Sequence, residues 1–560
     1  MKSDTTRIDD YDLNLARRNT VGDALTRAAE KSPRKTAVID GDRRVTYAQL
    51  EHDAEAIARG LLELPDAPEQ GEPVAVIVAN SYEFLPIYFA IAKAGRVVLP
   101  INYGLTADDI AWILDDAGAS LVFVDDAMLP LVDAAVKLGT TIRTAVVRSS
   151  GTATIGSAET DGTSTQADAS SAYQRRDLSE LLATPVDEEL RILIGSDDVV
   201  QCMYTSGTTG RPKGALVTHS SVVTGVMSNS MLLGEGWAQK PGITVVCLPL
   251  FHVTGLNTLA KPVLFMGGTL VIHHGFDPGA VLDAIEREHA TSFVGLPMMW
   301  AALVAENSRQ PRDLSSVDTA MYAMAQMPER VLAGMDEMMP HARKVLGSGQ
   351  TEVVPATTFQ RSEHRHGKNA SWGVSSPTVR TRIMDPGGNL LPVGEVGEIV
   401  YRGPHVTAGY WNRPDANEEA FRHGWFHSGD IGYMDEEGVI WFTDRVKDII
   451  KTGGENVSSM KVERILSDAP GVIECSVIGT EHARWGEAVT AVVLSDKVPS
   501  ADEADPEVRQ KAAEEVEAGI LAYVRERLSG FEAPKRVEFI DALPKTSTGK
   551  IRKNLLRDLF

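Results

Sequence analysis

The sequence predicts an α/β fold followed by a smaller α+β module at its C-terminal end. From Gly71 onward, short apolar runs alternate with amphipathic runs of helical period, which is typical of layered α/β domains with largely parallel sheets. After Arg445 this alternation gives way to a compact unit of about 115 residues, a usual size for a domain. The chain of 560 residues, 43% of them hydrophobic, can bury a large core and is long enough for two or three domains.

The first α/β units lie within residues 71–124. The apolar runs 74–78, 97–99 and 121–124 are predicted strands, and 82–94 is a predicted helix closed by Gly95. A second helix is predicted from Thr106, which is suited to cap it, to Gly118, where it stops.

The alternation continues after a break at residues 149–172, where a Ser, Thr, Gly, Ala and Asp mixture without periodicity predicts a surface insertion. Strands are predicted at 199–204, 244–248, 269–272 and 291–294, and a helix from Asp277-Pro278 to His289. In the C-terminal unit the pattern predicts a helix from residue 457, strands at 472–478 and 488–494, a helix ending near 528, and a strand at 537–540.

Composition and charge exclude several classes of protein. The net charge of −22 and pI near 5.1 argue against a nucleic-acid partner, because phosphate backbones are bound by basic faces. The three cysteines, Cys202, Cys247 and Cys475, are far apart in the sequence, which excludes a disulfide framework and a thiolate zinc site. So few cysteines predict that the protein is located in the reducing cytosol. Residues 1–18 are charged, unlike a secretory signal, and no run of eighteen apolar residues predicts a transmembrane helix. Peripheral membrane contact and the oligomeric state, a homodimer included, stay open.

A loop rich in glycine and hydroxyl side chains follows the predicted strand 199–204. Glycines let backbone N–H groups approach anionic oxygens, hydroxyls add donors and a lysine adds a charge, so the loop is suited to bind phosphate. A Walker loop does not fit, because only two residues separate its glycines and Gly214 follows the lysine. An ordinary polar surface loop is the alternative. The candidate phosphate-binding residues are Thr205, Ser206, Gly207, Thr208, Thr209, Gly210 and Lys213.

Over its whole length this loop resembles the signature loop of the adenylate-forming acyl-CoA synthetase superfamily, which includes luciferases and the adenylation domains of peptide synthetases. Four further stretches match that family in its own order: 347–352, 424–430, 444–456 and 543–551. The resemblance as a whole extends from about residue 20 to residue 560. It implies a large N-terminal domain of layered α/β sheets with a small β subdomain, residues 1–445, and a small mobile α+β domain, residues 446–560.

The resemblance assigns roles to residues that look ordinary in isolation. Thr351 would contact the α-phosphate of ATP, and Glu352 would hold Mg²⁺, which prefers a carboxylate together with phosphate oxygens. Alone, this Thr-Glu pair would be read as a helix cap. Asp430 would bind the ribose hydroxyls, since a carboxylate accepts hydroxyl donors. Arg445 would contact ribose or phosphate.

The same resemblance places the moving parts. Lys447 falls at the family's hinge, and Gly453, Gly454 and Glu455 form a loop expected to line the path of the CoA thiol. Lys550 matches the catalytic lysine, although a lysine near a chain end is ordinarily a solubilising one. His252 matches the wall between acid and nucleotide, with a core histidine as the alternative. The catalytic candidates are Lys550, Thr205, Glu352 and His252.

These groups predict the activation of a carboxylic acid. A carboxylate is already ionised at neutral pH and needs no general base; it needs charge neutralisation as it approaches the α-phosphate of ATP. The predicted protein is an ATP-dependent acyl-CoA synthetase that uses ATP, Mg²⁺ and CoA, forms an acyl-adenylate, and favours a fatty or other apolar acid. A stand-alone enzyme loading a carrier protein, a luciferase, and a silent acyl- or nucleotide-binding homologue are the alternatives.

The match to the family is weakest at adenine. The family usually carries an aromatic residue on which adenine stacks, and here that position is Ser348. Tyr322 is the candidate that would compensate. The methionines at 321, 324 and 327 recur at every third residue, which indicates core positions, with an acyl tunnel as the alternative.

Overall fold

The structure is a computed structural model that describes residues 10–149, 173–205, 211–233, 242–323, 327–500, 505–545 and 551–560. The described residues divide by contacts into two compact units. Unit 1 holds those up to Thr205, from Pro212 to Thr381 and from Tyr401 to Glu419; unit 2 holds Arg211, Arg382–Val400 and those from Ala420 onward. The insertion at 149–172 lies, from residue 150, outside the described residues. The domain boundary between residues 445 and 446 stays a prediction.

An eight-stranded sheet in unit 1 carries the strand that leads into the glycine-rich loop. Its central strands are parallel, whereas β9 pairs antiparallel with both β8 and β19 at one edge. In order across the sheet, the strands are β19 (Gly409–Tyr410), β9 (Lys213–Thr218), β8 (Val199–Thr205), β4 (Val97–Pro100), β3 (Pro73–Ile77), β5 (Leu121–Asp125), β6 (Thr144–Arg148) and β7 (Gln174–Asp177).

Both faces of this sheet are buried at its central strands β3 and β5. Alternate residues of β3 and β5 belong to two different hydrophobic cores, Val74 and Phe123 to one, and Ala75 and Val122 to the other. Parallel strands covered on both faces are expected to be apolar throughout, which is why these runs show no polar alternation.

A nine-stranded sheet forms the rest of the α/β framework. It is parallel from β1 to β14 and ends in antiparallel edge strands. The order is β16 (Val374–Ser375), β15 (Val353–Phe359), β14 (Arg343–Gln350), β13 (Thr319–Ala323), β12 (Ser292–Gly295), β10 (Ile243–Val246), β11 (Thr269–Ile272), β1 (Thr36–Asp40) and β2 (Arg43–Thr46).

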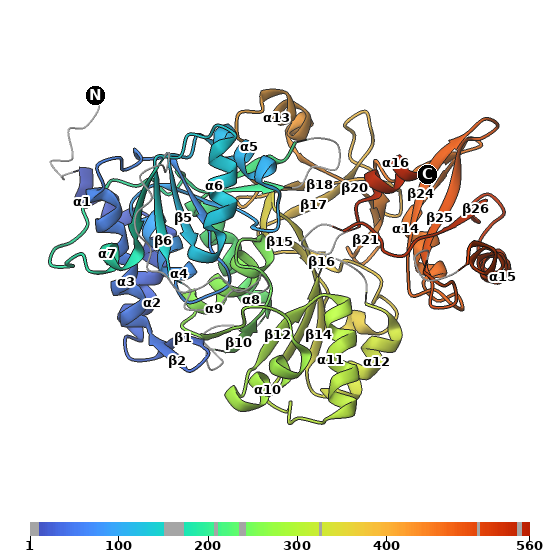
Figure 1. Cartoon of the computed structure of the whole chain (residues 1–560), viewed down its shortest axis with the longest axis horizontal. Helices are drawn as coiled ribbons and strands as arrows, with labels where there is room; N and C mark the ends of the chain where they lie inside the picture. The colour runs from blue at the N-terminus through green and yellow to red at the C-terminus, as the bar shows by residue number, and fades with distance from the viewer. Residues whose placement is uncertain are drawn as a thin grey trace. The chain divides into compact units, whose positions relative to one another are not determined.

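Helices cover the sheets (Figure 1), and those predicted within residues 71–124 are observed, α5 close to its predicted bounds. Helix α5 starts after Thr106, whose hydroxyl accepts from the backbone N–H of Asp109, and ends at Gly118 with φ 72°. The helices with most of their residues in unit 1 are α1 (Asp10–Arg17), α2 (Val21–Lys31), α3 (Tyr47–Glu63), α4 (Phe84–Lys93), α5 (Ala107–Ala117), α6 (Leu129–Lys137), α7 (Leu178–Leu182), α8 (His219–Leu233), α9 (Lys261–Phe265), α10 (Pro278–Glu288), α11 (Pro297–Arg309), α12 (Glu329–Met338) and α13 (Pro414–Ala420).

Unit 2 contains a small β layer and an α+β module. The four-stranded sheet has the order β17 (Arg380–Met384), β18 (Gly397–Arg402), β20 (Phe426–Met434) and β21 (Ile440–Arg445). The module's sheet has the order β23 (Glu455–Val457), β22 (Ile450–Thr452), β25 (Gly486–Leu494) and β24 (Glu474–His482), with β26 (Arg536–Phe539) paired to β25, and its helices are α14 (Ser459–Leu466), α15 (Pro506–Arg525) and α16 (Lys553–Leu559). The predicted α/β fold with a small α+β module is confirmed.

None of the helices in the described part of the chain combines the length and the apolar character needed to cross a membrane.

Candidate functional site

Three of the predicted site segments follow the carboxyl ends of parallel strands. Thr205 is the last residue of β8, His252 lies beyond the end of β10, and Thr351 follows the end of β14. Open α/β sheets bind ligands in the crevice outside the carboxyl ends of their strands. The topology therefore explains why residues from such distant parts of unit 1 are candidates for one function.

The hairpin β8–β9 holds the two ends of the glycine-rich loop. Thr205 pairs with Lys213 across the ladder, and the Thr205 hydroxyl donates a hydrogen bond to the Lys213 carbonyl at 3.4 Å. The loop tip with Ser206, Gly207, Thr208, Thr209 and Gly210 lies outside the described residues. The hairpin thus brings together the first and last candidate residues of the loop.

Glu352 lies in a tight turn between two strands. Gln350 pairs with Val353, so Thr351 and Glu352 are the two central residues of the β14–β15 hairpin, and the helix-cap alternative is wrong. The Glu352 carbonyl accepts a hydrogen bond of 2.6 Å from the backbone N–H of Thr407.

The sequence analysis missed a tyrosine that contacts this carboxylate. The Tyr410 hydroxyl donates to Glu352 Oε1 at 3.0 Å, while Oε2 accepts no hydrogen bond from the part of the chain that the structure describes. The Lys213 ammonium lies 5.4 Å from the centre of the Tyr410 ring and forms no ion pair with any described residue. A carboxylate with one free oxygen fits Mg²⁺, and a cation without a counter-ion fits a phosphate.

His252 precedes a single turn of π-helix, η2 (Thr254–Ala260). Its Nδ1 accepts a hydrogen bond from the backbone N–H of Thr254 at 3.3 Å. Asn80 fixes the segment before it, because its side chain accepts from the Leu250 N–H at 2.8 Å and donates to the Leu248 carbonyl at 3.0 Å. Sequence reasoning missed Asn80, although an amide directly after a buried strand was the available signal.

In unit 2, Asp430 and Arg445 face each other on neighbouring antiparallel strands. The Arg445 Nε lies 3.0 Å from Asp430 Oδ1, and the Asp430 side chain is only 4% exposed. The two predicted ribose contacts are therefore brought together as an ion pair. A carboxylate held by a cation keeps its charge and its capacity to accept hydroxyl donors.

Lys447 lies two residues beyond this pair. Burial, followed by the nearby Arg445 cation, lowers the pKa of Lys447 to about 8. The neighbouring Asp448 forms an ion pair of 2.8 Å with Arg557 of α16, so the last helix is attached to the predicted hinge segment.

The glycines of the predicted CoA-side loop form a two-residue hairpin turn. Gly453 and Gly454 have φ of 61° and 90°, and positive φ at both central positions is what the favoured hairpin turn requires. The Gly453 N–H donates to the Trp485 carbonyl at 2.8 Å, so the turn lies beside Trp485.

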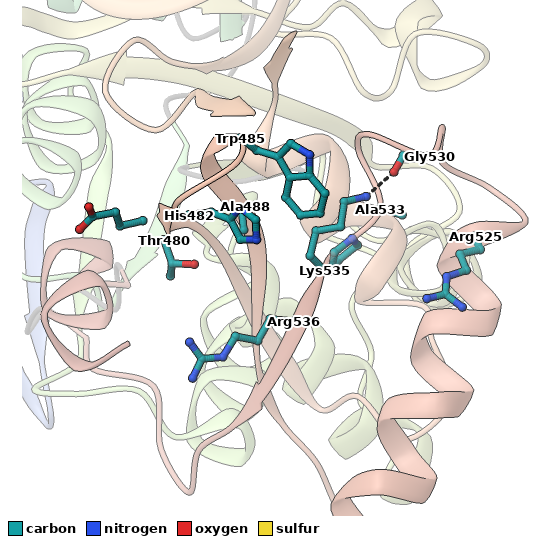
Figure 2. A pocket seen from close by; sticks show the side chains of 11 residues that line it. Thr480, His482, Trp485, Ala488, Arg525, Gly530, Ala533, Lys535 and Arg536 are labelled. Carbon is teal, nitrogen blue, oxygen red and sulfur yellow. Dashed lines mark hydrogen bonds between the residues drawn. The ribbon is translucent and has the colours of Figure 1, made fainter. Parts of the chain in front are cut away.

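Trp485 lines a cavity of about 560 Å³ in unit 2, shown in Figure 2. Its indole stacks on His482 at 4.2 Å, and the Lys535 ammonium lies 5.7 Å from the indole centre. Arg525 and Arg536 also line the cavity. An aromatic face beside three cations suits an anionic nucleotide. The cavity's other lining residues are Thr480, Glu481, Ala488, Gly530, Ala533 and Pro534.

Two expectations remain without a structural counterpart. Lys550 lies outside the described residues. Tyr322 is only 1% exposed and its hydroxyl donates to Gln360 Oε1 at 3.1 Å, so it is a core residue and does not compensate for Ser348 at adenine. Met321 and Met327 are buried as the periodicity indicates, and residue 324 is outside the described ranges.

Two family models match the chain. The model described as AMP-binding enzyme matches residues 25–411, and the model described as AMP-binding enzyme C-terminal domain matches residues 461–550. The chain belongs to the AMP-binding enzyme family. The first model alone accounts for most of the chain and includes Thr205, Lys213, Glu352 and Tyr410.

Known relatives are similar over almost the full chain. The feruloyl-CoA synthase of Amycolatopsis sp is 35% identical, covering 97% of this chain and 100% of that protein, and the long-chain-fatty-acid–CoA ligase FadD13 of Mycobacterium tuberculosis is 31% identical, covering 96% and 98%. The crystal structure of ATP-bound MatB from Rhodopseudomonas palustris is 28% identical with a TM-score of 0.78, covering 96% and 98%. The predicted enzyme class is confirmed: the chain is an AMP-forming acid–thiol ligase that uses ATP and CoA.

Proposed function

We propose that this enzyme activates an apolar carboxylic acid as an acyl-adenylate and transfers the acyl group to CoA. The observation that carries the proposal is the convergence of Lys213, the strand partner of Thr205, and Glu352 beside Tyr410 in unit 1. Among the residues that the structure describes, it provides a carboxylate with a free oxygen and a cation without a counter-ion at the carboxyl ends of parallel strands, where a metal-bound triphosphate would bind.

The first half-reaction joins the acid to AMP. A carboxylate oxygen forms a bond to the α-phosphorus of ATP, and the bond from that phosphorus to pyrophosphate breaks. Glu352 would hold Mg²⁺, which supplies charge neutralisation on the phosphates when bound. Lys213 and Thr205 bind the leaving phosphates, Thr351 contacts the α-phosphate, and Lys550 stabilises the charge that develops at the reacting phosphorus. Asp430 and Arg445 hold the ribose.

The second half-reaction moves the acyl group to sulfur. The CoA thiolate forms a bond to the acyl carbonyl carbon, and the bond to the AMP oxygen breaks. The small domain, residues 446–560, turns about Lys447 between the two steps and presents the turn of Gly453, Gly454 and Glu455. Because this turn contacts Trp485, the cavity beside it is suited to hold the nucleotide part of CoA, with Lys535 and Arg525 near its phosphates.

The surroundings of His252 favour an apolar acid. All seven residues of η2 are uncharged, and all but Thr254 are buried. Helix α8, which packs against η2, has His219 as its single ionisable residue, and burial lowers the pKa of His219 to about 3, so it is neutral. Aromatic character is added by Phe251, whose ring meets Tyr103 edge to face at 5.1 Å. A substrate with a second charge would find no partner in these walls.

A substrate screen tests this proposal. Pyrophosphate release in the presence of ATP, Mg²⁺ and CoA is expected with aromatic propenoic acids or fatty acids, and amino acids and dicarboxylic acids are expected to react at least about tenfold more slowly, because their second charge stays unpaired. Coupled pyrophosphate detection measures the rates, and mass spectrometry identifies the acyl-CoA product. A preference for a charged acid would contradict the assignment of an apolar pocket.

Replacing Trp485 with alanine tests the cavity. The variant is expected to raise the KM for CoA roughly tenfold, because stacking on an aromatic side chain contributes about 1–3 kcal/mol per base. The KM for ATP in the pyrophosphate exchange reaction, measured without CoA, serves as the internal reference. An unchanged KM for CoA in this variant would show that the nucleotide part of CoA does not bind in this cavity. Arg484→Ala is the matched control, because Arg484 precedes Trp485 in the sequence, is exposed, and does not line the cavity.

A further inference from the structure

We propose that Tyr410 is a positioning residue that keeps the Glu352 carboxylate and the Lys213 ammonium apart, so that each stays available to its own ligand. The inference rests on the proposed function of these two residues.

The backbone of Tyr410 is fixed on both sides. In the short strand β19, Tyr410 pairs with Ala215 of β9, and the next residue, Trp411, donates its N–H to the Gly214 carbonyl at 2.8 Å. The side chain of Asn417 holds the Tyr410 backbone, because its Oδ1 accepts from the N–H at 2.6 Å and its Nδ2 donates to the carbonyl at 3.1 Å. The ring therefore starts from a well-held position next to the glycine-rich loop.

The segment before β19 is also tied to Glu352. Val406 forms a β-bridge with Val353, and the Thr407 N–H donates to the Glu352 carbonyl at 2.6 Å. One short stretch, residues 406–411, thus contacts both the turn that carries Glu352 and the strand β9 that carries Lys213. Tyr410 is the side chain within it that contacts both.

The two contacts of Tyr410 differ in kind. Its hydroxyl donates to Glu352 Oε1 at 3.0 Å, and its ring lies 5.4 Å from the Lys213 ammonium. A cation over a ring face and a carboxylate on the hydroxyl are both favourable.

This arrangement prevents a competing ion pair. Lys213 and Glu352 have opposite charges and share a neighbour, yet they form no ion pair with each other. A direct pair would use the free carboxylate oxygen and the ammonium that the metal and the phosphates require, and ligand binding would first have to break it. Tyr410 binds one oxygen of Glu352 and turns Lys213 to its ring, which leaves the second oxygen and the ammonium free.

Metal binding measured directly separates this role from a general effect on folding. The probe is Mn²⁺, which takes the oxygen ligands of Mg²⁺ and is followed as the free ion by electron paramagnetic resonance, with a non-hydrolysable ATP analogue present. Tyr410→Phe removes the hydroxyl that holds Glu352 but keeps the ring that faces Lys213. It is therefore expected to weaken Mn²⁺ binding roughly tenfold, while the affinity for the metal-free analogue, which depends on Lys213, changes less than about threefold. Tyr410→Leu removes the ring as well and is expected to weaken both.

The matched control is Tyr433→Phe in unit 2, where the ring stacks on Trp441, and its Mn²⁺ affinity is expected to equal that of the unchanged enzyme. Unchanged Mn²⁺ affinity in Tyr410→Phe would overturn the proposal, and so would equal weakening of Mn²⁺ and analogue in that variant, which marks a purely structural role. An unchanged enzyme that bound neither Mn²⁺ nor the analogue would overturn the proposed function itself.

Discussion

Replacement of Lys550 by alanine is expected to abolish acid-dependent exchange of pyrophosphate into ATP, with a loss of roughly 10²–10³-fold in rate. The carboxylate needs no base, so the barrier of this step is set by the negative charge that gathers at the α-phosphorus, and a positioned ammonium is the group that offsets it. The same variant is expected to form acyl-CoA from CoA and a synthetic acyl-adenylate at a rate within about threefold of the unchanged enzyme, because the small domain has turned and withdrawn the lysine before that step.

Lys545→Ala provides the matched control for this prediction. Lys545 lies five residues earlier and forms a half-exposed ion pair of 2.8 Å with Glu474, an interaction that contributes about 0–1 kcal/mol to stability. Its removal is expected to leave both half-reactions close to normal. An equal loss of rate in both half-reactions for Lys550→Ala would contradict the proposal that the small domain turns between the two steps and withdraws Lys550 from the second.

The elements that could be predicted from the sequence are those with strong local signals. Helix α10 begins after Asp277 with Pro278 at its first position and ends at His289 in the left-handed region, as expected from its capping residues. Strand β11 (Thr269–Ile272) has the predicted bounds, because it is a short apolar run between glycines and a histidine pair. Boundaries in the C-terminal module are displaced by a few residues, since the strand β24 continues to His482 through a polar tip that shows no apolar pattern.

The parts of the site that could not be predicted depend on pairings between distant strands. Tyr410 reaches Glu352 because a two-residue strand pairs with β9, and so short a strand has no periodicity to detect. Trp485 was missed for a related reason: its place beside Gly453 follows from a hydrogen bond between a turn and a loop 32 residues later. Local sequence carries propensity and chemistry, whereas the register between remote segments is decided by the packing of the whole unit.

A fully buried lysine in unit 1 leads to the largest expected effect on stability. Lys261, the first residue of α9, is 1% exposed, and its ammonium group lies within hydrogen-bond distance of Tyr88 Oη at 2.5 Å, Asn257 Oδ1 at 2.6 Å and Gln201 Oε1 at 3.0 Å. Its polar partners are a hydroxyl and two amides, and no carboxylate of the described residues pairs with it. Burial therefore lowers the pKa of Lys261 well below its usual value of 10.5.

The consequence for stability has a definite sign. Between the lowered pKa of the folded state and 10.5, the unfolded chain binds a proton at this lysine that the folded protein does not, so the free energy of unfolding rises with pH over that interval. Lys261→Met removes the titrating group and keeps an unbranched side chain of similar length. We subtract the unfolding free energy of the Lys261→Met variant from that of the unchanged enzyme. This difference is expected to increase by up to about 1.4 kcal/mol for each unit of pH.

Denaturant unfolding followed by tryptophan fluorescence, at about pH 7, pH 8 and pH 9, measures this difference for both proteins. Every other titrating group contributes equally to the two curves, so subtracting them isolates Lys261 whatever its hydrogen bonds contribute at a single pH. Lys31→Met, at an exposed position at the end of α2, is the matched control and is expected to give a difference that stays constant with pH. Parallel curves for the Lys261→Met variant and the unchanged enzyme would show that the buried amine keeps its proton after folding, held by three neutral acceptors and the face of the Tyr88 ring 4.1 Å away.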